Sequence, residues 1–215
     1  MKRVIEPLVK MGVEFQVNQS FTLPFTIVPK SQIHPIIYEM QMASAQVKSS
    51  ILIAGLYCDE VTTVIENERT RDHTEKMLGL PVRFENEKII SSSLRKYYPE
   101  AKEYFVPGDI STSAFHIVLV LLTPNSELII KDVSLNPTRT GFIEVLKQMG
   151  ANIFYEDIKI SSNEEYGNVI VKSSSLENIE IDSQIIPNII DEIPILTIAG
   201  IFADGEFVIE NAKEL

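Results

Sequence analysis

The chain has 215 residues, of which 45% are hydrophobic and 23% charged, a balance typical of folded globular proteins. Its formal net charge of −11 repels phosphate backbones and no local basic patch offsets it, which argues against nucleic-acid binding. The longest apolar runs, residues 115–122 and 193–202, are well short of the roughly 20 residues that span a bilayer. With no signal-peptide pattern at the start, the expected location is the cytoplasm.

Three segments of the sequence share one pattern and recur at a period of about 65 to 70 residues. Each predicts an amphipathic helix, then a glycine suited to a left-handed C-cap, then a short strand. The segments are residues 2–15, 70–84 and 138–153, with glycines at positions 12, 79 and 150.

A second type of element alternates with the first. Residues 43–55, 108–115 and 191–199 predict helices that are apolar nearly all round and therefore buried. Each is followed by a predicted strand, at residues 62–66, 127–132 and 206–210. The alternation predicts a mixed α/β fold. A single-domain doubly wound sheet is the alternative architecture.

A domain boundary is expected at residues 106–109, Val-Pro-Gly-Asp. Proline and glycine there interrupt a predicted strand, and the cap of the next helix follows at once. An ordinary strand-to-helix turn is the alternative. The single cysteine, Cys58, cannot form an intramolecular disulfide and is interpreted as a partly buried structural thiol.

Four motifs resemble bacterial 5-enolpyruvylshikimate-3-phosphate (EPSP) synthases, and they occur in that family's order. They are Ala-Ser-Ala-Gln-Val-Lys-Ser at 43–49, Thr-Arg-Asp-His-Thr-Glu at 70–75, Pro-Gly-Asp-Ile-Ser at 107–111 with Leu-Asn-Pro-Thr-Arg-Thr-Gly at 135–141, and Ile-Asp-Glu-Ile-Pro-Ile-Leu at 190–196. The motif at 70–75 resembles the glyphosate-tolerant subgroup. The resemblance implies two similar domains built from βαβαββ units, the inside-out α/β barrel of enolpyruvyl transferases, with a ligand cleft between them.

The resemblance also implies a reaction. The family moves the enolpyruvyl group of phosphoenolpyruvate to the 5-hydroxyl of shikimate 3-phosphate and releases phosphate. A proton adds to the methylene carbon, the hydroxyl attacks the resulting cationic carbon, and the adduct then loses a proton and phosphate. A carboxylate near the hydroxyl and a proton donor near the methylene suffice, so no metal or redox cofactor is implied.

Five residues match functional positions of the family. Ser44 and Ala45 match positions that bind the phosphate of shikimate 3-phosphate, where a helix start offers free N–H groups. Gln46 matches a glutamine between the two substrates, and Arg71 an arginine near the sugar phosphate. Asp191 matches the carboxylate that contacts the 5-hydroxyl and accepts its proton.

Each of these residues has a structural alternative. Ser44 and Asp191 could be only helix caps, Gln46 an exposed first-turn residue, and Arg71 a solvated partner of Glu75 four residues on. Only the joint match to the family favours the functional interpretation. Three further motif residues, Lys48, Asp109 and Arg139, are interpreted as structural or hinge residues.

Several departures from the family lead to the expectation of an internal fragment. The family's lysine-serine signature and its early glycine-asparagine-rich loop have no counterpart, and its later stretch with arginine and lysine is not matched. Residues 1–107 are expected to form the later part of the shikimate-phosphate-binding domain, and residues 108–215 the early part of the second domain. Such a fragment should be inactive alone and could self-associate through exposed core faces. The alternatives are a non-catalytic binding or interaction module and a nucleotide-sugar enolpyruvyl transferase.

Overall fold

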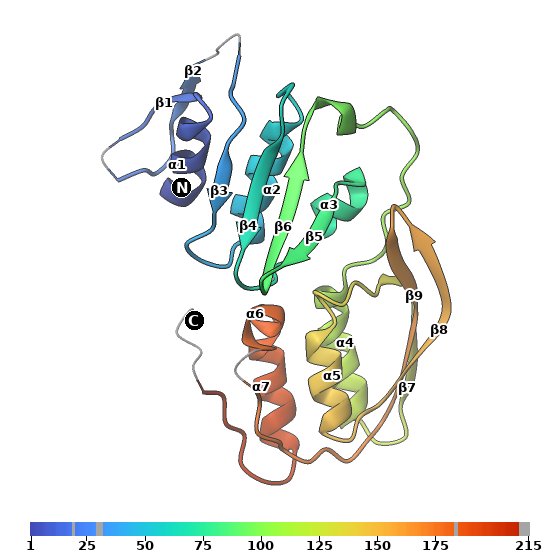
Figure 1. Cartoon of the computed structure of the whole chain (residues 1–215). Helices are drawn as coiled ribbons and strands as arrows, with labels where there is room; N and C mark the ends of the chain where they lie inside the picture. The colour runs from blue at the N-terminus through green and yellow to red at the C-terminus, as the bar shows by residue number, and fades with distance from the viewer. Residues whose placement is uncertain (19, 29–31, 183–184, 211–215) are drawn as a thin grey trace. The chain divides into compact units, whose positions relative to one another are not determined.

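Figure 1 shows the computed structural model of the chain, which describes residues 1–18, 20–28, 32–182 and 185–210. The chain divides into two compact units, Met1–Glu103 and Tyr104–Leu215. Each unit has its own hydrophobic core. Among the described residues, no helix combines the length and the apolar character needed to cross a membrane.

The first unit is a four-stranded sheet with helices, preceded by a helix and a two-stranded hairpin. In the sheet, β3 and β4 are parallel and the order is β3-β4-β6-β5, with the other pairs antiparallel. The elements are α1 (Lys2–Lys10), β1 (Glu14–Gln16), β2 (Thr26–Val28), β3 (Ile37–Glu39), α2 (Ala45–Gly55), β4 (Thr62–Glu66), α3 (His73–Leu78), β5 (Val82–Glu85), β6 (Lys88–Ser93) and a 3₁₀ turn η1 (Arg95–Tyr97).

The second unit repeats this plan with longer outer strands. Its sheet has the order β7-β9-β8 and is antiparallel throughout, while Gly108 makes a single parallel bridge to Val133 of β7. The elements are α4 (Ile110–Leu122), β7 (Glu127–Ser134), α5 (Gly141–Gln148), β8 (Asn152–Ser161), β9 (Glu164–Lys172), α6 (Ile186–Ile189) and α7 (Ile193–Phe202).

The internal repeat predicted from the sequence is confirmed. The order β3-α2-β4-α3-β5-β6 is a βαβαββ unit, and α4-β7-α5-β8-β9 repeats it with the Gly108 bridge in place of the first strand. Gly12, Gly79 and Gly150 end the three amphipathic helices at φ of +94°, +61° and +97°. Glycine is favoured there because L-residues with a side chain rarely adopt a positive φ. The fold is mixed α/β, as predicted.

The apolar helices form for the predicted reason but are not buried all round. Ile51 and Leu52 of α2 are fully buried in the first core, as are Ala114 and Ile117 of α4 in the second. On its other side, however, α4 exposes most of Phe115 and Leu119. α7 likewise exposes Ile201 and Phe202. α4 packs against the sheet and against α7, and these contacts leave one side of each helix exposed, so the expectation of all-round burial is wrong.

Two local predictions also need correction. Residues 206–210 were expected to form a strand, but only Val208 pairs, in an isolated parallel bridge to Glu180. A strand needs consecutive ladder bonds, and this segment has one. At the expected domain boundary, residues 101–107 form no regular strand for proline and glycine to interrupt. Gly108 instead bonds through its backbone to Asp132 and Ser134 at the edge of β7.

Candidate functional site

The N-terminal turn of α2 holds three of the candidate residues. Ser44 is the N-cap in extended conformation, and its hydroxyl accepts a hydrogen bond of 3.5 Å from the amide of Val47. Ser44 is 9% exposed, Ala45 is half-buried and Gln46 is exposed. The first-turn amides of a helix have no intrahelical acceptor and lie at the positive end of its dipole. This turn can therefore bind an anion, with the exposed Gln46 amide beside it.

Arg71 lies in the short segment between β4 and α3, and α3 packs beside α2. Ser49 of α2 and Thr74 of α3 share a hydrogen bond of 2.7 Å between their hydroxyls. Arg71 itself is half-buried. The Glu75 carboxylate, its alternative partner by helical spacing, lies in the interior, where it contacts Lys48 and Ser91. The structure therefore packs α3, which begins two residues after Arg71, against the helix that carries the other three residues.

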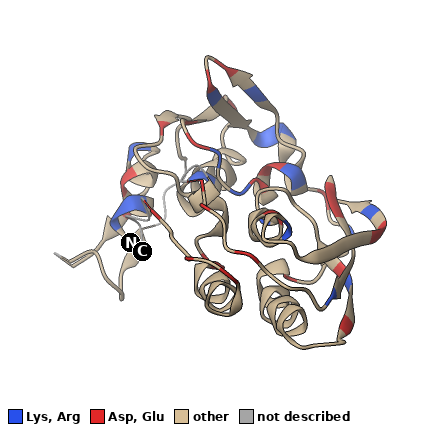
Figure 2. Ribbon diagram, turned by 90° about the horizontal axis from the view of Figure 1, so that it is seen from below, with Lys and Arg blue, Asp and Glu red and all other residues tan. Residues whose placement is uncertain are grey.

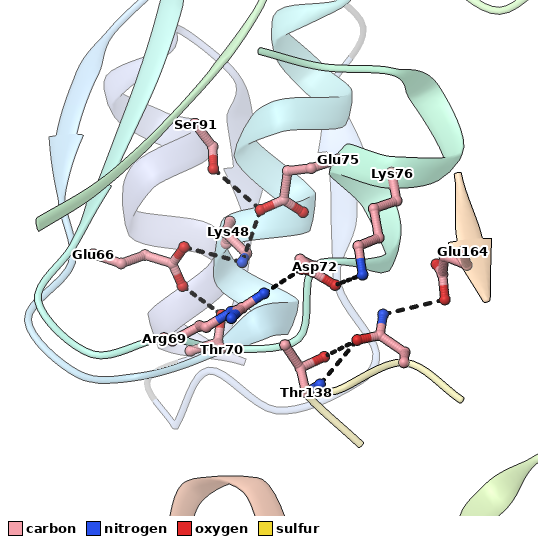
Figure 3. A network of polar contacts seen from close by, with 11 residues as sticks. Lys48, Glu66, Arg69, Thr70, Asp72, Glu75, Lys76, Ser91, Thr138 and Glu164 are labelled. Carbon is pink, nitrogen blue, oxygen red and sulfur yellow. Dashed lines mark hydrogen bonds and ion pairs between the residues drawn. The ribbon is translucent and has the colours of Figure 1, made fainter. Parts of the chain in front are cut away.

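A buried polar network lies beneath this pair of helices (Figure 3). The Lys48 ammonium is 3.0 Å from Oε2 of Glu66 and 2.8 Å from Oε1 of Glu75. All three side chains are at most 3% exposed. Glu66 also accepts a hydrogen bond of 2.5 Å from Thr70, and Glu75 one of 3.1 Å from Ser91. The interpretation of Lys48 as a structural residue is consistent with this burial.

In the second unit, Asp191 lies between α6 and α7 with its side chain 49% exposed. It is not the cap of α7, because the N-cap position is occupied by Glu192. The guanidinium of Arg139 is 3.4 Å from the carboxylate of Asp191 and 3.4 Å from that of Asp109. The Arg139 side chain is largely buried, at 13% exposed, whereas the carboxylates of Asp109 and Asp191 beside it are accessible to solvent.

Two residues that the sequence did not single out complete this cluster. The hydroxyl of Ser111 accepts a hydrogen bond from Arg139 and donates one to the carboxylate of Glu192. Glu192 is 3% exposed. The contacts link the first turn of α4 to the N-cap residue of α7, which follows Asp191 in the chain.

A tight turn before α5 places Arg139 in this cluster. Asn136 is fully buried, and its side-chain oxygen accepts hydrogen bonds from the amide and hydroxyl of Thr138, at 2.9 and 2.8 Å. Its amide group donates to Glu164 of β9 at 3.1 Å. Asparagine favours such turns because its side chain can bond to the backbone two residues on. The Asn-Pro-Thr-Arg motif therefore orients the arginine.

Asp109 caps α4 and forms the other side of the cluster. Its carboxylate accepts hydrogen bonds from the amides of Ser111 and Thr112, each at 3.2 Å, and from the Thr112 hydroxyl at 2.8 Å. Burial on its own raises the pKa of Asp109, but these hydrogen bonds and the nearby charge of Arg139 outweigh it and lower the pKa below the ordinary value. Asp109 is therefore a charged cap.

The distribution of charge limits where an anion can bind. Lys and Arg are interspersed with Asp and Glu over the described residues (Figure 2). A pocket in the second unit is lined by four carboxylates, which repel a phosphate; the lining residues are Ile179, Glu180, Ile181, Asp182, Glu206, Val208 and Glu210. No group of three or more His, Cys, Asp or Glu among the described residues is arranged to hold a metal ion. An anionic ligand must therefore be held by a few placed donors.

Comparison with solved structures defines the class of protein. The chain superimposes on the enolpyruvyl transferase NikO from Streptomyces tendae with a TM-score of 0.64 at 13% identity, covering 95% of this chain and 49% of that one. It superimposes on an EPSP synthase from Acinetobacter baumannii with a TM-score of 0.81 at 40% identity, covering 100% of this chain and 50% of that one. The fold is that of the enolpyruvyl transferases.

Sequence comparison defines the family. The family model for EPSP synthase (3-phosphoshikimate 1-carboxyvinyltransferase) matches residues 1–215, and the chain belongs to this family. A relative named 3-phosphoshikimate 1-carboxyvinyltransferase from Petrotoga mobilis is 49% identical over 220 residues. One from a Thermoanaerobacter species is 43% identical over 218 residues. Both matches cover 100% of this chain but 50% and 51% of the relatives. The chain thus spans about half the length of the curated relatives it matches.

Proposed function

We propose that this chain carries part of the substrate site of an EPSP synthase, the transferase that moves the enolpyruvyl group of phosphoenolpyruvate to shikimate 3-phosphate. The observation that supports the proposal most is the α2 turn of Ser44, Ala45 and Gln46, on a helix that packs against α3, the helix that follows Arg71. A serine hydroxyl, first-turn amides and a guanidinium are complementary to a sugar phosphate.

In this proposal each residue keeps the role that the family resemblance implies. Ser44 and Ala45 bind the phosphate of shikimate 3-phosphate, and Arg71 adds a charge-assisted contact to the same group. Gln46, exposed at the helix start, donates an amide hydrogen bond between the two substrates. Asp191 accepts the proton of the 5-hydroxyl, and its half-exposed carboxylate is accessible to a hydroxyl.

Calorimetric titration of the chain with shikimate 3-phosphate tests the phosphate site. Binding should be saturable, and Gln46→Ala and Arg71→Gln should each weaken it. Arg83→Gln is the matched control, because it removes the same charge from a side chain that is 70% exposed on β5. Titration with shikimate, which lacks the phosphate, should give much weaker binding. Equal affinity for shikimate, or an equal effect of the control, would refute the assignment.

We further propose that residues 1–107 and 108–215 are the later part of the shikimate-phosphate-binding domain and the early part of the second domain. Because the chain spans about half the length of its relatives, turnover should require the remainder of such a protein. The pure chain incubated with both substrates should therefore release no phosphate above background. Steady phosphate release that Asp191→Asn abolishes would show that the chain is sufficient.

Self-association is also proposed. The adjacent helices α4 and α7 expose Phe115, Leu119, Ile201 and Phe202, which are between 60% and 70% exposed. Neighbouring apolar side chains of this size favour association in water. Sedimentation velocity should show dimers or larger species that increase with concentration, and Leu119→Lys with Ile201→Lys should shift them to monomers. A monomer at all concentrations would contradict the proposal.

Two finer assignments follow from the motifs. The Thr-Arg-Asp-His-Thr-Glu segment at 70–75 supports membership in the glyphosate-tolerant subgroup, so an active enzyme that contains this segment should retain turnover at glyphosate concentrations that inhibit a sensitive enzyme. The substrate class is tested by competition: a uridine-diphosphate sugar should not displace shikimate 3-phosphate. Displacement by the nucleotide sugar would favour a nucleotide-sugar enolpyruvyl transferase instead. The cytoplasmic location remains a prediction.

A further inference from the structure

Lys48 is the one charged residue of α2, and its position on that helix is informative. It follows Ser44 by one helical turn on α2, and its side chain is directed into the protein with 1% of its surface exposed. An ammonium group is seldom buried unless it is paired, because its loss of hydration is costly. Here it is paired twice, with carboxylates from two other elements.

The two carboxylates bracket Arg71 in the sequence. Glu66 is the last residue of β4, and its other oxygen accepts the hydroxyl proton of Thr70, the residue before Arg71. Glu75 lies in α3, four residues after Arg71. Figure 3 shows Lys48 between these two acids. A single ammonium on α2 therefore holds both ends of the segment that carries Arg71.

The network allows little freedom between the two candidate phosphate-binding elements. With distances of 2.8 and 3.0 Å, a small shift of α2 against α3 would separate charges that are at most 3% exposed to solvent. Buried ion pairs of this kind contribute little net stability but can specify one arrangement over others. The hydrogen bond between Ser49 and Thr74 acts in the same direction.

We propose that Lys48 is a positioning residue for the phosphate site: its ion pairs with Glu66 and Glu75 fix the N-terminal turn of α2 relative to Arg71, so that both contact one phosphate group. The inference rests on the proposed function for the identity of the ligand. It adds that the pre-formed geometry of the site depends on a buried ammonium that does not itself contact the ligand.

The test compares a charge-free network with the wild type. In Lys48→Met/Glu66→Gln/Glu75→Gln the glutamine oxygens can still accept from Thr70 and Ser91, so folding is retained while the ion pairs are lost. Affinity for shikimate 3-phosphate should fall roughly 2- to 30-fold. Hydrogen exchange at the amides of residues 44–47 and 71–74 should become faster, with exchange in the β4 core unchanged.

Two controls separate positioning from a general effect. Lys88→Met/Glu39→Gln removes an exposed ion pair of 2.5 Å in the same unit and should leave both affinity and exchange unchanged. Glu66→Gln alone keeps the Lys48–Glu75 pair and should bind more tightly than the triple variant.

The outcomes distinguish the inference from the function on which it rests. A folded triple variant with wild-type affinity and wild-type exchange at both segments would overturn the role of Lys48. A folded wild type that binds no shikimate 3-phosphate would instead overturn the proposed function. In that case exchange at residues 44–47 and 71–74 still decides whether Lys48 couples the two segments.

Discussion

Substitution of Lys48 by methionine should destabilise the first unit strongly. Methionine has a similar volume but leaves the carboxylates of Glu66 and Glu75, 1% and 3% exposed, without their counter-ion. Removal of one partner from a buried ion pair typically costs about 3–5 kcal/mol, a large part of the roughly 5–15 kcal/mol that stabilises a domain. Urea-dependent hydrogen exchange in peptides around Ile51 and Val64 reports on this unit alone, since both residues belong to its core.

Two further variants test whether the unpaired buried carboxylates cause the destabilisation by Lys48→Met. Lys88→Met breaks a pair whose side chains are 40% and 50% exposed, so it should cost less than about 1 kcal/mol. The triple variant Lys48→Met/Glu66→Gln/Glu75→Gln has no buried charge left and should be more stable than Lys48→Met alone. The unfolding free energy of Lys48→Met could lie within about 1 kcal/mol of the wild-type value, or the triple variant could be no more stable than Lys48→Met. Either result would show that unpaired buried charge does not destabilise the unit.

Three other predictions concern the cap, one glycine and the thiol. Asp109→Ala should cost about 1 kcal/mol of unfolding free energy at neutral pH. Because the folded pKa of Asp109 is lowered, this stabilisation is present above the unfolded pKa of about 3.9 and is lost as the pH falls. The urea unfolding free energies of wild type and variant should therefore converge between about pH 5 and pH 2, and a constant difference would contradict this prediction. Gly200→Ala places a Cβ 2.4 Å from Cγ of Phe207 and should cost about 1–3 kcal/mol, and an unchanged thermal midpoint would argue against this packing. Cys58 is 2% exposed and burial raises its pKa, so a thiol reagent should modify it slowly until denaturant is added; rapid labelling of the native chain would show that the thiol is accessible.

The sequence predicted the helices and the repeat well because both depend on local signals. Ser44 before an apolar run, and the glycines at 12, 79 and 150, mark helix ends through their own backbone and side-chain preferences. The segment at 206–210 failed because strand formation depends on a partner distant in sequence, and residues 177–180 offer only isolated bridges.

Local sequence signals identified candidate site residues but not their partners that are distant in the sequence. Motif residues could be matched one by one, but the hydrogen bonds of Ser111 to Arg139 and Glu192 join positions up to 81 residues apart. Nothing local identifies such partners. One local signal does indicate the buried pair. A lysine within a largely apolar helix, and a glutamate at an inward position of β4, are expected to pair because neither charge is stable alone in the interior.

An NMR titration of the isotope-labelled chain with shikimate 3-phosphate, followed at individual amides, tests the proposed phosphate site directly. Saturable shifts are expected at Ala45, Gln46 and Arg71, and shikimate without the phosphate should not reproduce them. The amides lining the acidic pocket around Glu180 and Glu206 should not respond. A saturable response at that pocket, or none at the start of α2 in a folded chain, would contradict the assignment of the phosphate site.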